Sequence, residues 1–281
     1  MNVLIVTINI SLVDPIQVSY SIPMHLPFSK NKYFTGRDRE LATIHETLRC
    51  PDEPLSDQRI MVLHGLGGIG KTQLAIQYAY IHQKEYASVW WVNASTNETL
   101  SQSFLEIAQQ LLSHHTKPTR AGLKEDSVQA AVALGLPPDV VGQNGKLNPS
   151  KDSMGIVVDA VKSWFAAESN NRWLLIIDNY DDLENVKIFD FLHTNSSGSI
   201  LITSRSRATG RIGKDFEVQE VTEDEGLEIL RKVSCKDMAS FQKGMHMPHS
   251  NASAHLKPLP TPSRVMTPGL DISGTGNYLG Q

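Results

Sequence analysis

The segment from residue 65 to residue 72, Gly-Leu-Gly-Gly-Ile-Gly-Lys-Thr, constrains this chain more than any other stretch. It satisfies the pattern G-x-x-x-x-G-K-[ST], in which glycines let the backbone wrap closely around a phosphate with its N–H groups pointing inward. In that pattern the lysine, here Lys71, reaches the β- and γ-phosphates, and the hydroxyl of Thr72 binds Mg²⁺. The alternative is a flexible turn, which would need no particular neighbours in the sequence.

The flanking residues favour phosphate binding over a turn. An apolar run at residues 60–64 predicts a strand before the loop, and apolar residues within 74–79 give the following helix a buried face. That helix begins within residues 70–72, so its N-terminal dipole also favours an anion. We therefore expect the nucleotide contacts of the loop to come from Gly65, Gly67, Gly68, Ile69, Gly70, Lys71, Thr72 and Gln73.

Strand-like and helix-like stretches alternate through the middle of the chain. Five apolar runs predict strands at residues 60–64, 87–92, 173–177, 199–203 and 216–221. The first four lack strict alternation, as expected where helices cover both faces of a parallel sheet. Amphipathic stripes at 100–112 and 156–165 predict helices, the first with a capping box of Ser95 and Glu98. The sequence predicts an α/β fold, a three-layer αβα sandwich around a five-stranded, mainly parallel sheet.

Composition divides the chain into three zones. Residues 1–32 form a weakly patterned leader, and residues 33–235 form the nucleotide-binding core, with a proline-containing, loop-rich insertion at 116–150. Residues 236–281 are rich in Pro, Ser, His and Gly without a sustained period, so we expect a disordered tail.

Charge and cysteine content exclude several classes of function. A net charge of −4 argues against a nucleic-acid-binding surface. The two cysteines, Cys50 and Cys235, lie outside any CxxC spacing, so neither a disulfide framework nor a zinc knuckle is expected. No apolar run approaches the roughly 18 residues of a membrane helix. We expect a cytoplasmic protein without membrane or nucleic-acid partners.

A carboxylate follows the third predicted strand. Asp178 ends the run Trp-Leu-Leu-Ile-Ile and should emerge at the carboxyl edge of the sheet, where ligands bind in open α/β folds. With a phosphate loop upstream, we expect Asp178 to support Mg²⁺ together with Thr72; the alternative is a turn residue at the end of a strand. The next residue is Asn179, whose amide can orient a water but cannot accept its proton. Slow hydrolysis is therefore expected.

An arginine follows the fourth predicted strand. Arg205 comes directly after Thr203 and Ser204. It could detect the γ-phosphate through charge-assisted hydrogen bonds, or it could be a solvated surface arginine near Asp178.

Taken in order, these motifs resemble the NB-ARC class of STAND P-loop NTPases, found in NLR-type immune and cell-death proteins. Residues 33–41, Tyr-Phe-Thr-Gly-Arg-Asp-Arg-Glu-Leu, are similar to the hhhGRxxEL element of that family. Residues 89–93 resemble its second-strand element, residues 174–179 its Walker B strand, and residues 198–205 its sensor strand. The resemblance implies that Phe34, Thr35 and Arg37 lie near the adenine and ribose, and that Gly36 also belongs to the nucleotide-binding residues. It further implies that Lys71, Asp178 and Arg205 carry the catalytic and sensing roles.

The resemblance also implies a function. It predicts ADP or ATP as the ligand, Mg²⁺ as the metal, and a signalling switch that associates with related NB-ARC proteins. It covers residues 33–234, and the GLPL-type loop and MHD-type histidine of the ARC subdomains do not occur. We therefore expect a core truncated before those subdomains.

Two other functions remain open on the sequence. An active P-loop ATPase needs a base near the γ-phosphate and would release phosphate at several turnovers per second. A non-catalytic interaction fragment would associate with full-length relatives whether or not nucleotide is present. The switch hypothesis differs from both in expecting nucleotide binding with little turnover, and the expected lack of ARC subdomains predicts a weakened affinity.

Overall fold

The computed structural model describes residues 22, 24, 26–49, 58–116, 123–192 and 197–242. Residues 1–21, 23 and 25 of the leader predicted for 1–32, and residues 243–281 of the tail predicted for 236–281, lie outside the described residues. The chain divides into two compact units, 1–236 and 237–281, and the sheet with the helices that cover it lies in the first.

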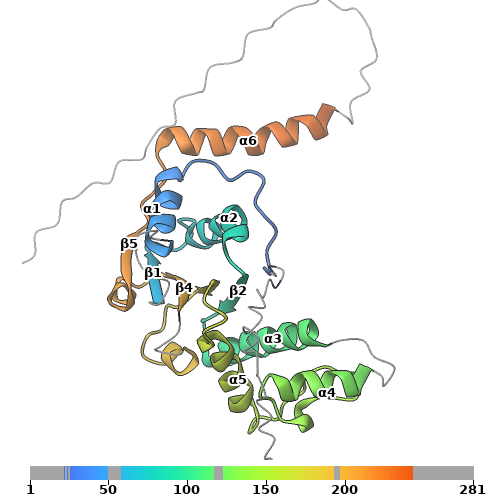
Figure 1. Ribbon diagram of the computed structural model, residues 1–281. Coiled ribbons are helices and arrows are strands. Elements are labelled where there is room, and N and C mark those ends of the chain that lie inside the picture. Colours follow the sequence, from blue (N-terminus) through green and yellow to red (C-terminus); the bar gives the residue numbers. More distant parts are fainter. Residues whose placement is uncertain are drawn as a thin grey trace, which may run out of the picture. The chain divides into compact units, whose positions relative to one another are not determined.

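A five-stranded sheet forms the centre of the first unit (Figure 1). Its strand order is β2-β3-β4-β1-β5, and every neighbouring pair is parallel, with Val62 opposite Ile202 in the central pair. The strands are β1 (Gln58–His64), β2 (Ser88–Asn93), β3 (Trp173–Asp178), β4 (Gly198–Ser204) and β5 (Lys214–Glu217). The α/β fold predicted from the sequence is confirmed.

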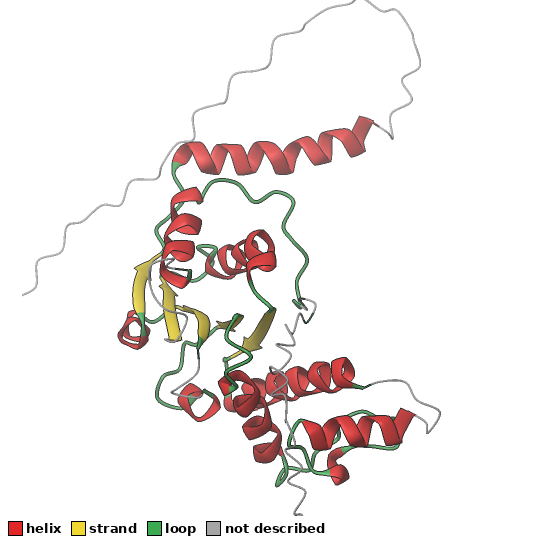
Figure 2. Ribbon diagram, viewed as in Figure 1, coloured by secondary structure: helices red, strands yellow, loops and turns green. Residues whose placement is uncertain are grey.

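Helices cover both faces of this sheet (Figure 2), because successive strand side chains point to opposite faces. Met61 and Leu63 of β1 pack with α1 (Asp38–Leu48) and α2 (Lys71–His82), whereas Val62 packs on the other face. That other face is covered by α3 (Asn97–His115) and α5 (Met154–Ala166), and α4 (Leu123–Ala133) packs against α3. The remaining elements are η1 (Gln83–Glu85), η2 (Pro138–Val140), η3 (Ile188–Phe191), η4 (Arg207–Ile212) and α6 (Glu223–Gln242).

The strand order explains why distant segments meet. β1 pairs with β4, and β4 pairs with β3, so the carboxyl ends of all three strands lie at one edge of the sheet. The glycine-rich loop leaves β1 at this edge and leads into α2. Residues that follow β3 and β4 are therefore brought beside the loop.

Two local predictions need correction. The fifth strand spans 214–217 rather than 216–221, because its partner β1 ends at His64, which pairs with Glu217. The capping box of α3 is formed by Thr96 and Thr99 and not by Ser95 and Glu98. The hydroxyls of Thr96 and Thr99 each accept from the other residue's backbone N–H, as the side chains of a capping box do. The box therefore forms one residue later than predicted.

The segment expected to be a loop-rich insertion has regular structure. Residues 123–133 form α4, and an isolated antiparallel bridge joins Val141 to Leu147. Buried side chains from this segment, including Ala131 and Val140, belong to the core under α3 and α5. It extends the apolar core on that face of the sheet.

The described structure extends beyond residues 33 and 235, the proposed boundaries of the core. Ile22 is buried and its N–H donates to the carbonyl of Ala87 at 2.9 Å. At the other end, α6 was expected to end near Val233 but continues to Gln242, seven residues into the predicted tail. Residues 234–242 contain no glycine or proline, and the first such residue is Gly244, so nothing in the sequence stops the helix earlier.

Candidate functional site

The glycine-rich loop folds around the side chain of Lys71. This lysine is the first residue of α2 and is buried, and the preceding Gly70 has a φ of 101°, which a side chain would strain. The Lys71 Nζ donates to the carbonyl oxygens of Gly65, at 2.9 Å, and Leu66, at 2.8 Å. Burial lowers the pKa of this amine. Lys71 is therefore a buried ammonium group inside the loop. A bound anion would offset the free-energy cost of burying this charge.

A buried carboxylate faces the start of α2. Asp178 is the last residue of β3 and is 3% exposed, and its Oδ1 accepts from the Thr72 Oγ1 at 2.9 Å and from the Thr203 Oγ1 at 2.6 Å. Burial raises the pKa of Asp178, although the two hydroxyl donors oppose that shift. The strand order is what joins these groups, since Thr203 lies on β4 and Thr72 on α2.

Asp178 and Thr72 fit a magnesium ion chemically. Carboxylate and hydroxyl oxygens are the donors that this hard cation takes in proteins, usually together with water and phosphate oxygens. A cation beside the Asp178 carboxylate would also offset the burial that raises its pKa. The Thr72 hydroxyl already lies within hydrogen-bonding distance of the same oxygen, so both donors are in place.

Two residues beyond the strand ends complete this edge. Asn179 has a φ of 62°; its N–H donates to the Thr203 Oγ1 at 3.1 Å and its Nδ2 to the Asp178 Oδ2 at 3.3 Å. Arg205 donates from Nε to the Asp181 Oδ2 and from its backbone N–H to the Asp181 Oδ1, both at 2.6 Å. The Arg205 side chain is 68% exposed, so this ion pair can open without burying a charge.

Two cavities flank the loop. One, of about 520 Å³, is polar and is lined by Lys71, Thr72, Asn179, Asp181 and Arg205 among others. The second, of about 800 Å³, has aromatic and aliphatic walls. It is lined by Asn31, Tyr33, Phe34, Thr35, Arg37, Leu66, Gly67, Gly68, Ile69, Gly70, Gln73, Glu220, Val221, Ile229 and Val233. The two cavities share the loop residues Gly67, Gly68, Gly70 and Gln73, so together they have room for a phosphate chain at one end and an apolar base at the other.

Arg37 and Gly36 occupy different positions with respect to these cavities. Arg37 is buried, pairs with Glu40 at 2.7 Å, and donates from Nη2 to the carbonyl of Ile69 at 3.3 Å. It lines the larger cavity, as expected. Gly36 does not line either cavity; a Cβ there would lie 2.2 Å from the Glu225 Oε1, so this glycine makes room for α6.

The structure therefore brings most of the expected residues together. Arg37, Gly67, Gly68, Ile69, Gly70, Lys71, Thr72, Gln73 and Arg205 line one or both cavities, whereas Gly36, Gly65 and Asp178 line neither. Gly65 instead contributes its carbonyl to Lys71. Sequence reasoning missed Thr203 as the second hydroxyl on Asp178, and it missed the α6 residues Ile229 and Val233 as cavity walls. The position of Thr203 at the end of a strand was the only available signal.

Known proteins place the chain among nucleotide-binding domains. The AAA ATPase domain family matches residues 33–202, more than half of the chain. An NLR-like protein of Hyaloscypha variabilis, described as a nucleotide-binding leucine-rich repeat (NLR)-like protein, is 28% identical over 224 residues. That match covers 73% of this chain and 19% of the relative, so the chain spans about a fifth of the relative's length.

Solved structures give looser likenesses. The Cdc6p protein of Pyrobaculum aerophilum is 13% identical, with a TM-score of 0.42 over 75% of this chain and 52% of that one. The ORC2 protein of Aeropyrum pernix is 15% identical, with a TM-score of 0.36 over 70% of this chain and 52% of that one. Both are too distant to bear on the function.

Among the described residues, no helix combines the length and apolar character needed to cross a membrane.

The family match spans the glycine-rich loop, the strand that ends at Asp178 and most of β4. The chain belongs to the AAA ATPase domain family of P-loop NTPases and is a nucleotide-binding domain.

Proposed function

We propose that this chain binds ADP or ATP together with Mg²⁺ and serves as the nucleotide-dependent switch of an NLR-like, NB-ARC-type signalling protein. The observation that carries the proposal is the arrangement of Thr72, Asp178 and Thr203 beside a lysine that lies inside the phosphate loop. In this assignment the loop residues hold the phosphates, Lys71 contacts the β- and γ-oxygens, and Thr72 and Asp178 hold the metal. The metal supplies charge neutralisation between phosphate oxygens when it is bound.

Slow hydrolysis follows from the residue after the metal carboxylate. Asn179 cannot accept a proton from an attacking water, and its amide already donates to Asp178. The other carboxylate in the polar cavity, Asp181, is held by two hydrogen bonds from Arg205. The site therefore suits retention of a nucleotide better than rapid turnover.

Arg205 is the proposed sensor of the γ-phosphate. It lies beside the loop, since a Cβ on Gly67 would be 3.6 Å from the Arg205 Cδ. Its guanidinium can exchange Asp181 for a γ-phosphate, because both partners accept charge-assisted hydrogen bonds of the same kind. ADP would leave the Arg205–Asp181 pair intact and ATP would compete for it, which gives the two nucleotides different effects on this loop.

Support for the signalling role comes from the relative and not from the site. The 28% identical protein of Hyaloscypha variabilis is described as NLR-like. We place the nucleotide-binding core at residues 33–235, with association between related NB-ARC proteins in the cytoplasm as the expected setting.

Equilibrium binding of a fluorescent ADP analogue tests the proposal. Lys71 is enclosed by the loop carbonyls, so the larger guanidinium of a Lys71→Arg variant cannot occupy the same position. We expect this variant to bind about tenfold more weakly or worse, the cost of a charged hydrogen bond. The matched control is Lys84→Arg on an exposed residue of η1, which should bind as the parent does. Equal binding by all three proteins would overturn the site.

A faster ATPase is the second candidate, and one observation favours it. Asp181 lines the same cavity as Lys71 and Thr72, so it could serve as a base once Arg205 releases it. Phosphate release at several turnovers per second, abolished by Asp181→Asn, would favour this candidate over the switch.

A further inference from the structure

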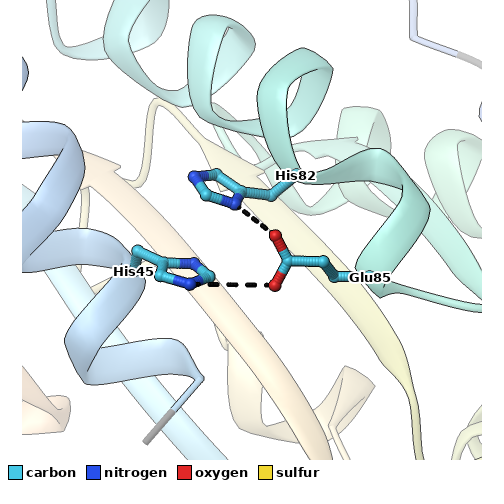
Figure 3. A group of neighbouring side chains, drawn as sticks. All are labelled: His45, His82 and Glu85. Carbon is cyan, nitrogen blue, oxygen red and sulfur yellow. Dashed lines mark hydrogen bonds and ion pairs between the residues drawn. The ribbon is translucent and has the colours of Figure 1, made fainter.

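Three polar side chains meet at the far end of α2 from the phosphate loop (Figure 3). His45 comes from α1, His82 is the last residue of α2, and Glu85 lies in η1. α2 has 12 residues, so about 17 Å separates this group from Lys71 at the start of the helix. The group therefore has no part in the nucleotide site.

The carboxylate of Glu85 is directed at both imidazoles (Figure 3). The His82 Nδ1 lies 2.6 Å from the Glu85 Oε1, and the His45 Nε2 lies 3.7 Å from the Glu85 Oε2. The two imidazole rings stack with their centroids 4.1 Å apart and their planes 16° apart. One potential ligand atom from each residue lies within 4.8 Å of the other two.

The surroundings of His45 favour its neutral ring, the form that binds metals. Burial and the neighbouring His82 lower the pKa of His45. Its Nδ1 is buried and has no hydrogen-bond partner within the described structure. On Glu85, burial favours the neutral acid, but the hydrogen bond with His82 and the charges of nearby groups outweigh it and lower the pKa. A carboxylate beside a neutral imidazole is a metal-binding combination.

We propose that His45, His82 and Glu85 form a binding site for a borderline divalent cation, with Zn²⁺ as the best match. Two imidazoles and one carboxylate constitute a zinc ligand set that leaves a fourth position for water. Mg²⁺ is a poor match because it prefers oxygen ligands, whereas nitrogen ligands suit Zn²⁺.

Only small movements are needed to bring the ligand atoms to zinc geometry. Bonds of about 2.0–2.1 Å in a tetrahedral site put neighbouring ligand atoms about 3.3 Å apart. The stacked rings must rotate so that their nitrogens converge, and both side chains are partly exposed, at 35% for His45 and 16% for His82. Arg49, whose Nε lies 3.8 Å from the Glu85 Oε2, would keep only a long ion pair and retains its contact with the Tyr86 ring.

A metal at this position would join the carboxyl ends of α1 and α2. The amino ends of the same two helices meet at the nucleotide loop, where Arg37 donates to the carbonyl of Ile69 and Lys71 lies inside the turn. The cation would therefore hold α1 and α2 together at their carboxyl ends, whereas a bound nucleotide would contact both helices near their amino ends.

Calorimetric titration of the full chain with Zn²⁺ tests the site. The protein is first stripped with a chelator and then held in excess Mg²⁺, which would occupy the proposed oxygen ligands near Asp178. We expect one Zn²⁺ per chain. Glu85→Gln and His82→Gln should each weaken binding about 100-fold or more, at least the cost of losing an outer-shell partner. Zinc should also raise the melting temperature of the parent and leave that of Glu85→Gln unchanged.

Matched controls exclude other histidines. A variant with His246, His249 and His255 replaced by Ser removes the histidines of the 236–281 segment, and His114→Gln removes one from the end of α3. Both should bind Zn²⁺ as the parent does. The proposal is overturned if the parent binds no zinc at 100-micromolar levels, if the serine variant loses the site, or if both Glu85→Gln and His82→Gln bind as tightly as the parent. Glu85→Gln preserves side-chain shape, and its circular dichroism spectrum shows whether it remains folded.

Discussion

Asp178, the proposed metal ligand, carries a cost in the nucleotide-free protein. Its side chain is buried at the end of β3, and burial raises its pKa. A carboxyl whose pKa is raised by folding stabilises the folded state below its unfolded pKa, and that contribution is lost as the pH rises through the folded pKa. Above the ordinary Asp pKa, the buried carboxyl therefore reduces the stability of the folded state, a cost that a bound cation would relieve.

Replacement of Asp178 by Asn should expose this cost. The amide oxygen can still accept from Thr72 and Thr203, but the side chain no longer ionises. We expect the melting temperature of the variant, relative to the parent without ligand, to rise as the pH increases from about 4 to about 7, the range above the ordinary Asp pKa. Thermal unfolding of both proteins across that range measures it. A difference that stays constant or shrinks with rising pH would contradict the assignment.

Position 179 carries an asparagine and not a second carboxylate, and replacing it with Asp tests whether this limits hydrolysis. Asp shares with Asn a tolerance for the left-handed backbone seen here, at a φ of 62°, so Asn179→Asp should fold. The new carboxylate can act as a base, and we expect ATP hydrolysis to rise by about 100-fold or more, the low end of general-base catalysis. Phosphate release under single-turnover conditions measures the change. Asn185→Asp, in the turn before η3, is a control that should leave the rate unaltered.

At the scale of single residues, the sequence predicts the role of a residue when its partners lie within the same motif. Lys71 and Thr72 follow from the spacing of the loop, and Asp178 follows from the end of an apolar run. Thr203 could not be assigned, because its bond to Asp178 depends on β3 and β4 being neighbours, which no local pattern specifies. The same reason applies to Gly36, which matches a nucleotide-binding element in sequence but lies against Glu225.

At the scale of the elements, α6 closes the larger cavity. Ile229 and Val233 line it from this helix, and Glu225 ties the helix to the segment before α1 by accepting from the Arg37 N–H at 3.2 Å. The Lys232 Nζ adds a bond to the Thr35 Oγ1 at 2.7 Å. The base of a bound nucleotide would therefore contact residues near both ends of the proposed core, residues 33–235.

A charge on this wall should weaken nucleotide binding. Ile229→Glu places a carboxylate in an apolar wall, where an unpaired charge is costly. We expect ADP binding to weaken by about tenfold, or about 1.4 kcal/mol. Leu230→Glu alters the next residue, which is 65% exposed and outside the cavity, and should bind ADP as the parent does. Equal affinity in both variants would show that α6 does not form the wall.

Element positions could be predicted where packing is local. The buried residues of α3, such as Phe104 and Ile107, recur at helical spacing and were identified. The predicted bounds of β5 differ from the observed ones because they depend on where its partner β1 ends. The sequence does not predict α4, because prolines on either side of it indicate a loop. In each case a tertiary partner overrode the local pattern.

At the scale of the whole molecule, the two proposed sites lie at opposite ends of α2. Its carboxyl edge gathers Lys71, Thr72, Asp178 and Arg205 from different elements, whereas the histidine cluster lies at the opposite end of α2. A domain that grips a nucleotide and turns it over slowly gains stability from that ligand for as long as it is bound. Ligand-dependent stability is thus the property that the fold and the site predict jointly.

Thermal unfolding with and without ADP and Mg²⁺ tests that property most directly. At ADP concentrations about 100 times the dissociation constant, binding to the folded state alone contributes about 2.7 kcal/mol. For a domain of this size we expect a rise of about 5–10 °C in melting temperature, and little or no rise in Lys71→Arg. A parent protein that gains nothing from millimolar ADP and Mg²⁺, or a Lys71→Arg variant that gains as much as the parent, would contradict nucleotide binding through this loop.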